Sequence, residues 1–182
     1  MRKILFIIVT LIFCNGMMAQ TTSESAAKLM EKAYKQAARE NKNVMMIFHA
    51  SWCIWCKKLD ASLNDPSCKN YFDKSFVIVH LTILENGEKK QLENPGAIDI
   101  FNENGGKDAG LPYFLFYDKN GKLLADSKMK SAKAGADAKL ANMGCPTEDD
   151  EIAAFVEILK KTSKITDKEI TAITERFKKN KK

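Results

Sequence analysis

The chain has 182 residues, of which 45% are hydrophobic and 29% are charged, and this suits one compact domain with appendages rather than two full domains. Its lysines and arginines outnumber its aspartates and glutamates by 29 to 23. Part of the surplus lies in the C-terminal tail, residues 176–182, where the basic residues are not clearly interleaved with stacking aromatic groups. We therefore expect a solvated tail and no nucleic-acid partner.

Residues 1–19 have the three parts of a secretory signal peptide. Met1-Arg2-Lys3 precedes an apolar stretch over residues 4–13, and cleavage is expected after Ala19. The apolar stretch is too short to span a bilayer as a helix, although an uncleaved anchor and a buried first helix stay open as alternatives. Cys14 also suggests a lipoprotein, but Phe13 stands where lipidation normally requires a small residue. Export to the periplasm would place the mature chain where disulfides form and persist.

From residue 23 onwards, the spacing of apolar residues is helical in some segments and strand-like in others. The elements predicted in this half are a helix over 23–41, a strand over 44–48, a helix over 53–64, a short helix over 67–72 and a strand over 76–82. A strand, a helix and a second strand in this order predict a right-handed crossover between parallel strands.

The second half predicts an antiparallel hairpin and two further helices. Residues 84–110 are polar and glycine-rich around a short helix at 97–101. Pro112 then stands at the first position of a strand that runs to Tyr117, and a turn over 118–121 leads to a returning strand over 122–125.

Two capping patterns mark the C-terminal helices. Thr147 to Asp150 has the form of a capping box and precedes an apolar helical face, and Thr166 to Glu169 opens a further helix. The apolar face carries Ile152, Phe155, Val156 and Leu159.

Cys53 and Cys56 carry the chemistry that the sequence reveals most clearly. If the upstream strand ends near Ala50 and a helix starts at Cys53, unpaired backbone N–H groups and the positive end of the helix dipole stabilise a Cys53 thiolate. Cys56 lies one turn further in, where desolvation raises the pKa of a thiol. We therefore expect Cys53 to attack a substrate disulfide and Cys56 to resolve the mixed disulfide.

The order of elements resembles the thioredoxin fold over about residues 25–162. Its specific marks are Trp52-Cys53-x-x-Cys56-Lys57, the Leu111-Pro112 pair and the Asp118-x-x-Gly121 hairpin. A finer similarity, over residues 42–53 and 64–66, is to the branch that includes the periplasmic catalytic domain of the transmembrane thiol:disulfide interchange reductase and its secreted relatives.

This resemblance implies an α/β thioredoxin fold in which a central mixed sheet is flanked by helices, with an extra C-terminal helix. It also implies that Pro112 is a cis-proline beside the two sulfurs and that the backbone of Leu111 pairs with the substrate. The expected organisation is a signal peptide over 1–19, a thioredoxin-like domain over 20–163, and a C-terminal helical extension with a basic tail over 164–182.

The chain departs from thioredoxin at Ile47, because thioredoxins bury a carboxylate there that helps to move the proton of the second cysteine. Asp60 lies four residues after Cys56 on the same helical face, where the periplasmic branch also has an acid. Our hypothesis is that Asp60 exchanges this proton with Cys56. The alternative is an ordinary exposed helix carboxylate.

Other side chains near the cysteines are candidate supports. His49 could tune the thiolate or simply pack at the end of the strand, and Lys57 could stabilise Cys53 electrostatically. Trp55 is expected to provide an apolar rim for docking substrate proteins. Trp52 fits either the same rim or a packing role.

Cys68 and Cys145 are the remaining cysteines of the mature chain. Cys68 lies in an apolar helical context, which suggests a buried thiol, whereas Cys145 precedes Pro146 in a loop and is expected to be exposed. A disulfide between them stays open. A zinc site is disfavoured because structural zinc normally uses two cysteine pairs, and this chain has one.

The leading functional hypothesis is an exported thiol:disulfide oxidoreductase that acts on protein disulfides or thiols, without a metal or an organic cofactor. A membrane electron-transfer partner is expected if the protein is a reductant. The alternatives are a chaperone-like binding module with a non-catalytic disulfide, and a structural role in which the Cys53–Cys56 bond is a fixed staple.

Overall fold

The computed structural model describes residues 23–130 and 139–181. The expected signal peptide, with Cys14 inside it, lies outside the described residues. Within the described part of the chain, every helix is too short or too polar to cross a membrane.

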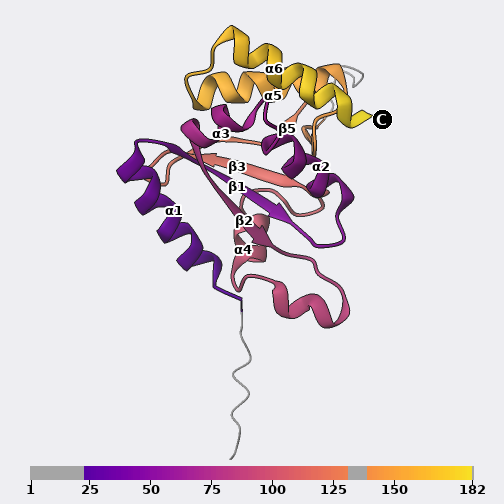
Figure 1. Ribbon diagram of the computed structural model, residues 1–182. Helices are drawn as coiled ribbons and strands as arrows, with labels where there is room; N and C mark the ends of the chain where they lie inside the picture. The colour runs from indigo at the N-terminus through magenta and orange to yellow at the C-terminus, as the bar shows by residue number, and fades with distance from the viewer. Residues whose placement is uncertain (1–22, 131–138, 182) are drawn as a thin grey trace, which may run out of the picture.

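A four-stranded mixed sheet in the order β2-β1-β3-β4 forms the centre of the molecule (Figure 1). The strand β1 (Asn43–His49) pairs in parallel with β2 (Phe76–Thr82) and antiparallel with β3 (Tyr113–Tyr117). The edge strand β4 (Leu123–Asp126) pairs antiparallel with β3. This topology confirms the predicted parallel pair and the predicted hairpin.

The central strand β1 is apolar on both faces because helices cover both sides of the sheet. Met45 and Ile47 point into one core cluster, whereas Val44, Met46 and Phe48 point into the other, and all five side chains are at most 1% exposed. The alternation follows from the two-residue repeat of a strand.

The helices α1 (Ala26–Glu40) and α4 (Ala97–Glu103) cover one face of the sheet (Figure 1). Ser25 caps the start of α1, since its side chain accepts a hydrogen bond from the Lys28 N–H. Asn41 ends the helix in the left-handed conformation that this residue type tolerates, with φ of 53°. The predicted helix over 23–41 is therefore confirmed.

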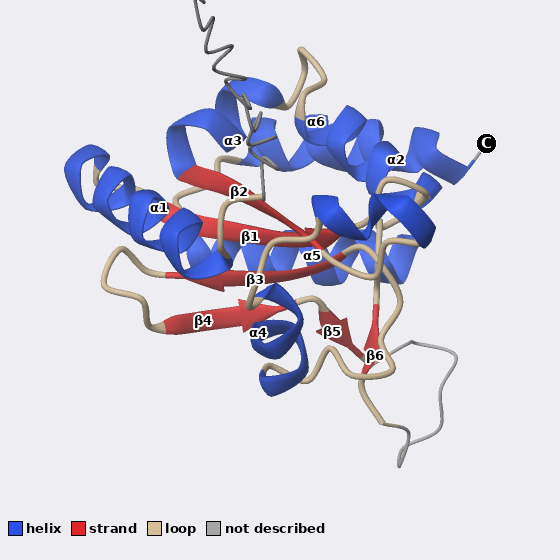
Figure 2. Cartoon of the chain, turned by 90° about the horizontal axis from the view of Figure 1, so that it is seen from below, coloured by secondary structure: helices blue, strands red, loops and turns tan. Residues whose placement is uncertain are grey.

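Four helices cover the opposite face and enclose the larger core cluster (Figures 1 and 2). They are α2 (Ile54–Leu63), α3 (Lys69–Ser75), α5 (Asp149–Thr162) and α6 (Asp167–Lys178). Phe72, Phe155 and Phe177 are all fully buried between these helices and the sheet. The structure thus has the predicted α/β architecture, with the C-terminal helices packed into it.

The capping of α5 begins one residue later than the sequence suggested. Glu148 is the N-cap, and the Glu151 carboxylate accepts hydrogen bonds from the backbone N–H groups of Thr147 and Glu148. The prediction of a box over Thr147 to Asp150 is wrong because Glu151, rather than Asp150, reaches back to the backbone. The box formed by Thr166 and Glu169 at the start of α6 is confirmed.

Several short elements were not predicted. They are two 3₁₀ helices, η1 (Gly87–Leu92) and η2 (Lys179–Lys181), and a separate two-stranded sheet of β5 (Lys128–Met129) and β6 (Ala141–Asn142). Figure 2 shows β5 and β6 beyond the tip of β4. These strands are two residues long and show no alternation that a pattern could reveal.

The expectation of a solvated C-terminal tail is wrong for two of its residues. Phe177 is 0% exposed and packs against Phe155 with ring centroids 5.1 Å apart, and Asn180 is 5% exposed. The tail carries cations on its surface, but it is anchored to the core through these two side chains.

Candidate functional site

The site begins where β1 passes into α2. The Cys53 N–H donates to the Ala50 carbonyl over 3.0 Å in the connecting turn, and Cys53 is the N-cap of α2. Cys53 and Cys56 form a disulfide, with Cα atoms 5.3 Å apart. The Cys53 sulfur also accepts a hydrogen bond from the Cys56 N–H over 3.1 Å. This places Cys53 against the unpaired N–H groups of the helix start, as the spacing predicted.

Solvent exposure does not distinguish the two sulfurs in the oxidised form. Cys53 is 3% exposed and Cys56 is 2% exposed, so the expectation that Cys56 lies much deeper is not visible in their accessibility. What differs is position along the helix, since Cys53 is the cap and Cys56 lies inside the first turn. A charge on the Cys53 sulfur would interact more strongly with the helix dipole.

Leu111 lies beside the disulfide although it comes from a distant part of the sequence. The Leu111–Pro112 peptide bond is cis. Leu111 packs against a small buried cluster formed by Ala50, Cys53 and Cys56. The pairing of β1 with β3 explains this proximity, because Pro112 immediately precedes the strand that neighbours β1.

Exposed apolar side chains surround the disulfide. Trp52 is 52% exposed, Ile54 is 60% exposed and Trp55 is 43% exposed. The Trp52 indole N–H donates to the Leu84 carbonyl over 2.8 Å, so this ring is held in place by the loop after β2. Isolated exposed apolar residues are common, but three of them within four residues of the chain, next to a disulfide, are unusual.

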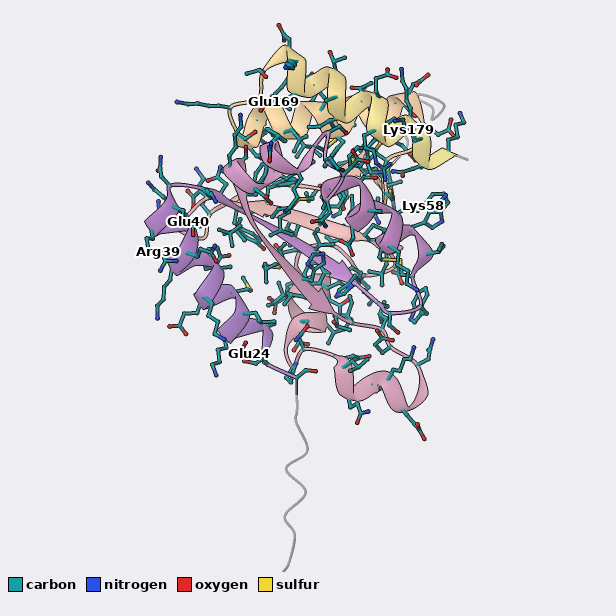
Figure 3. The ribbon with its side chains drawn as sticks, in the orientation of Figure 1. Glu24, Arg39, Glu40, Lys58, Glu169 and Lys179 are labelled. Carbon is teal, nitrogen blue, oxygen red and sulfur yellow. A yellow bond between two sulfur atoms is a disulfide. The ribbon has the colours of Figure 1, made fainter. Side chains whose placement is uncertain are left out.

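Lys58, rather than Lys57, is the lysine that contacts the aromatic rim. Its Nζ atom lies 4.4 Å from the centroid of the Trp55 ring and donates to the Asn180 carbonyl over 2.8 Å. Lys57 is exposed, and its expected interaction with Cys53 stays a prediction. Figure 3 shows Lys58 on α2 on the same side of the molecule as Lys179, where the chain leaves α6.

Asn180 connects the C-terminus to the back of α2. Its side-chain amide donates to the Ser62 hydroxyl over 2.8 Å and to the Cys145 sulfur over 3.4 Å, and its Oδ1 accepts from Arg176 over 3.0 Å. Ser62 is fully buried. This contact could not be predicted from the sequence, because it joins residues far apart in the chain through polar groups.

Asp60 is paired with a histidine from β2. The His80 Nε2 and Asp60 Oδ1 atoms are 2.8 Å apart, and the His80 ring packs against the His49 ring with centroids 5.1 Å apart. His49 shares a 3.1 Å hydrogen bond with the Thr82 hydroxyl. Ile47, which replaces the carboxylate of thioredoxins, is 1% exposed within the apolar core of the same sheet face. The polar side chains of Asp60, His80 and His49 therefore lie together between α2, β2 and β1. The position of the thioredoxin carboxylate is occupied by the apolar side chain of Ile47.

Burial lowers the pKa of His49, and the positive charge on His80 lowers it further, while Asp60 and Glu85 act in the opposite direction. In the unfolded chain the imidazole keeps its ordinary pKa of about 6.5. At pH values between the lowered pKa of the folded chain and this ordinary pKa, the unfolded chain binds more protons than the folded chain. The free energy of unfolding therefore falls as the pH drops through this range.

We expect His49→Gln to lose less stability than the parent between about pH 7 and about pH 5, because the glutamine has no proton to gain. Urea unfolding at a series of pH values measures this difference. If the two chains lose stability in parallel, the burial of His49 does not contribute to the pH dependence.

A buried carboxylate fixes the turn before Cys53, and sequence reasoning missed it. Glu85 is 3% exposed, and its two oxygens accept hydrogen bonds from the Ser51 N–H and from the Ser51 hydroxyl, the latter over 2.8 Å. Lys89 donates to the same hydroxyl over 3.2 Å. These bonds hold the backbone two residues before the disulfide.

Neither Cys68 nor Cys145 forms a disulfide, and both are buried, at 1% and 5% exposed. The expectation for Cys68 is confirmed. The expectation that Cys145 is exposed is wrong, because Asn180 and the core residues around α5 cover the loop that carries it. Burial raises the pKa of both thiols, and that of Cys145 reaches about 12.

These raised pKa values predict that Cys68 and Cys145 resist alkylation in the folded, reduced chain near pH 8, because the thiolate is the reactive form. Iodoacetamide treatment followed by mass spectrometry measures the modification at each cysteine. We expect label on these two thiols only after denaturant is added. Rapid labelling of either one in the folded chain would contradict the burial described above.

A groove of about 250 Å³ lies beside the aromatic rim. Its lining includes Trp55, Leu111, Asn142, Gly144 and Cys145. It joins the residues next to the disulfide to the β5–β6 region. Within residues 23–130 and 139–181, no cluster of three or more histidine, cysteine or acidic side chains is arranged to hold a metal ion.

These features define a thioredoxin-type fold with a disulfide at the start of the helix that follows the central strand. A family model described as a thioredoxin-like domain matches residues 30–136, and the chain belongs to this family. The predicted family resemblance is thereby confirmed.

The relatives found by sequence are thiol:disulfide interchange proteins. The protein DsbD of Haemophilus ducreyi is 28% identical over 99 residues, and that of Photorhabdus laumondii is 27% identical over 90 residues. The matches cover 54% and 49% of this chain but 16% and 14% of the relatives. The chain therefore spans about one sixth of the length of these relatives.

Two solved structures are similar over most of their length. A disulphide isomerase from Xylella fastidiosa Temecula1 is 17% identical, with 86% of this chain and 92% of that chain covered and a TM-score of 0.47. The oxidised C-terminal domain of Neisseria meningitidis DsbD is 18% identical, with 78% and 98% covered and a TM-score of 0.46.

Proposed function

We propose that this chain is an exported thiol:disulfide oxidoreductase that exchanges a dithiol and a disulfide with protein substrates through Cys53 and Cys56. The observation that carries the proposal is the Cys53–Cys56 disulfide at the start of α2 with Leu111 packed against it. The relatives' names point to the same chemistry. The signal-peptide pattern of residues 1–19 supports export.

In the reducing direction, the Cys53 thiolate attacks one sulfur of a substrate disulfide, so that a Cys53–substrate bond forms and the substrate's other sulfur leaves as a thiolate. Cys56 then loses its proton and attacks the Cys53 sulfur. The Cys53–Cys56 bond closes and the second substrate thiolate leaves. Two electrons pass from the chain to the substrate, and the reverse sequence oxidises a substrate dithiol.

Leu111, Pro112 and Trp55 are the proposed substrate contacts. A substrate segment in extended conformation would lie along the backbone of Leu111, beside the disulfide, and would cover the exposed Trp55 ring. Trp52 and Lys57 are proposed to support the rim and the charge on Cys53. The chemistry needs no organic cofactor, because the two sulfurs carry both electrons.

Asp60 is proposed to exchange the proton of Cys56, with His80 holding its carboxylate over 2.8 Å. Asp60→Asn should shift the pH profile of disulfide reduction and slow the resolution step, because the amide cannot accept the proton. The matched control is Asp73→Asn, which removes an exposed helix carboxylate paired with Lys69. Unchanged pH profiles in both variants would leave Asp60 as an ordinary surface carboxylate.

A reductase in an oxidising compartment needs electrons from outside it, so a membrane electron-transfer partner is proposed for the reducing direction. The equilibrium between the mature chain, from residue 20, and glutathione fixes the reduction potential. A potential well below that of glutathione would favour a reductase, and one well above it an oxidase or isomerase.

Insulin reduction by the mature chain, with dithiothreitol as the electron source, tests the proposed function directly. We expect turnover in the parent and none in Cys53→Ser. The exposed residues Trp52, Ile54 and Trp55 favour a binding module as the second candidate. Suppression of aggregation without redox turnover in the parent would support that module, and a disulfide that resists strong reductant would support a structural staple.

A further inference from the structure

The side chain of Asn142, at the end of β6, bridges the two sides of the cis-proline. Its Nδ2 donates to the Gly110 carbonyl over 2.7 Å and to the Pro112 carbonyl over 3.0 Å. Its Oδ1 accepts from the Ser127 hydroxyl over 2.7 Å and from the Gly144 N–H over 3.2 Å. One amide therefore makes four hydrogen bonds, all within the β5–β6 region and the loop before β3.

The chemistry of the partners fixes the orientation of this amide. The two carbonyl oxygens can only accept a hydrogen bond, and the Gly144 N–H can only donate one. Rotating the amide by half a turn would place NH₂ against an N–H group and oxygen against two carbonyl oxygens. The side chain consequently has one favourable arrangement.

Ser127 links this amide to the central sheet. Ser127 is 0% exposed, and its hydroxyl accepts from the Phe114 N–H of β3 over 3.1 Å while it donates to Asn142. The Ser127 carbonyl also accepts from the Met143 N–H over 2.9 Å. A continuous set of hydrogen bonds thus runs from a rigid strand through Ser127 and Asn142 to the loop that carries the cis-proline.

The result of these contacts is that both carbonyls flanking Leu111 are occupied by one side chain. Within residues 23–130 and 139–181, the backbone N–H and C=O of Leu111 itself make no hydrogen bond to the main chain. The groove of about 250 Å³ is lined by Gly110, Leu111, Asn142 and Trp55. The backbone of Leu111, a residue that lines this groove, therefore has no main-chain partner within the described residues.

We propose that Asn142 is a positioning residue that holds the loop over residues 110–112 so that the backbone of Leu111 pairs with an extended polypeptide beside the disulfide. The proposal rests on the proposed function. The short β5–β6 sheet is separate from the central sheet. The proposal predicts that it contributes to the recognition of substrates that carry a peptide backbone.

The test compares two disulfides that differ in whether they carry a backbone. The reduced chain is mixed with insulin or with hydroxyethyl disulfide, which has no amide group, and the second-order rate constants are measured. For Asn142→Ala we expect a loss of about tenfold with insulin, the scale of one or two lost hydrogen bonds, and less than about twofold with hydroxyethyl disulfide. The reduction potential against glutathione should not change.

Asn142→Asp gives a second, independent variant. The carboxylate keeps the two acceptor contacts with Ser127 and Gly144 but loses both donors to the carbonyls, so the same selective loss is expected. The matched control is Asn43→Ala, which removes a 2.7 Å bond from an asparagine amide to the Thr162 carbonyl at the other end of β1. This control should react with both disulfides at the parent rate.

The possible outcomes distinguish the positioning role of Asn142 from the proposed function. Equal losses with both disulfides, or no loss with insulin in either Asn142 variant, would overturn the positioning role while the proposed function stood. A parent that reacts with neither disulfide would refute the proposed function, and the positioning role with it. Thermal unfolding of each variant shows whether a loss comes from unfolding, and a folded Asn142→Asp with selective loss is sufficient support.

Discussion

Cys56→Ser should trap a covalent complex between Cys53 and a substrate protein, whereas Cys53→Ser should lower the rate of exchange to that of the uncatalysed reaction. In the first variant the mixed disulfide forms but lacks the thiol that resolves it, and in the second the attacking sulfur is absent. The geometry supports this division, because Cys53 caps α2 and Cys56 lies inside its first turn.

Non-reducing electrophoresis after incubation with reduced or scrambled substrate measures the trapped complex, and insulin reduction measures turnover. Cys68→Ala is the matched control, since Cys68 is buried and unbonded away from the disulfide and should leave both readouts unchanged. Complexes trapped equally well by Cys53→Ser and by Cys56→Ser would contradict the assignment of roles.

Phe177→Ala should lower the free energy of unfolding by about 3–5 kcal/mol, the usual cost of removing a fully buried phenylalanine side chain. Phe177 is 0% exposed and lies in the same core cluster as Phe155 of α5 and Phe72 of α3. Ile173 of α6 is equally buried there. A chain that ends at residue 163 would lose both side chains and would expose the core that they cover.

Urea unfolding measures this effect, with Lys178→Ala as the control. The Lys178 side chain is 48% exposed on the same helix, so its loss should change the free energy of unfolding by less than about 0.5 kcal/mol. The expected division at residue 163 makes the opposite prediction, because a separable extension would contribute little. A loss below about 1 kcal/mol for Phe177→Ala would support that division.

The predictions that succeeded rested on local signals. The apolar run at residues 44–48, the hairpin turn at 118–121 and the helical spacing of α5 each depend on neighbours a few residues away, and short-range patterns report these well. The cis peptide bond between Leu111 and Pro112 could be predicted because the resemblance to thioredoxin implied it.

The features that were missed depend on contacts between distant residues. The position of Cys145 before Pro146 in a loop predicts an exposed thiol, but Asn180 near the end of the chain covers it. The hydrogen bonds that hold the cis-proline loop join Asn142, in a strand of two residues, to the buried Ser127. The pairing of Asp60 with His80 required knowledge that β2 lies under α2. Polar contacts of this kind leave no periodicity in the sequence.

The contacts of Asn142 and Asn180 were missed for the same physical reason. Asparagine is normally on the surface, and a sequence shows neither which segments fold over such a residue nor which partners form hydrogen bonds with it. Asn180 and Asn142 are tolerated in sheltered positions because both the oxygen and the nitrogen of each amide are hydrogen bonded.

The pH dependence of Cys53 alkylation in the reduced chain measures whether the start of α2 stabilises a thiolate on this sulfur. Iodoacetamide labelling, followed by mass spectrometry of the individual cysteines, gives the apparent pKa. We expect a value within roughly 3.5–7.5, with Cys53 reacting well before Cys56. Equal reactivity of the two sulfurs, with the pKa of about 8.5 of an ordinary cysteine, would contradict it.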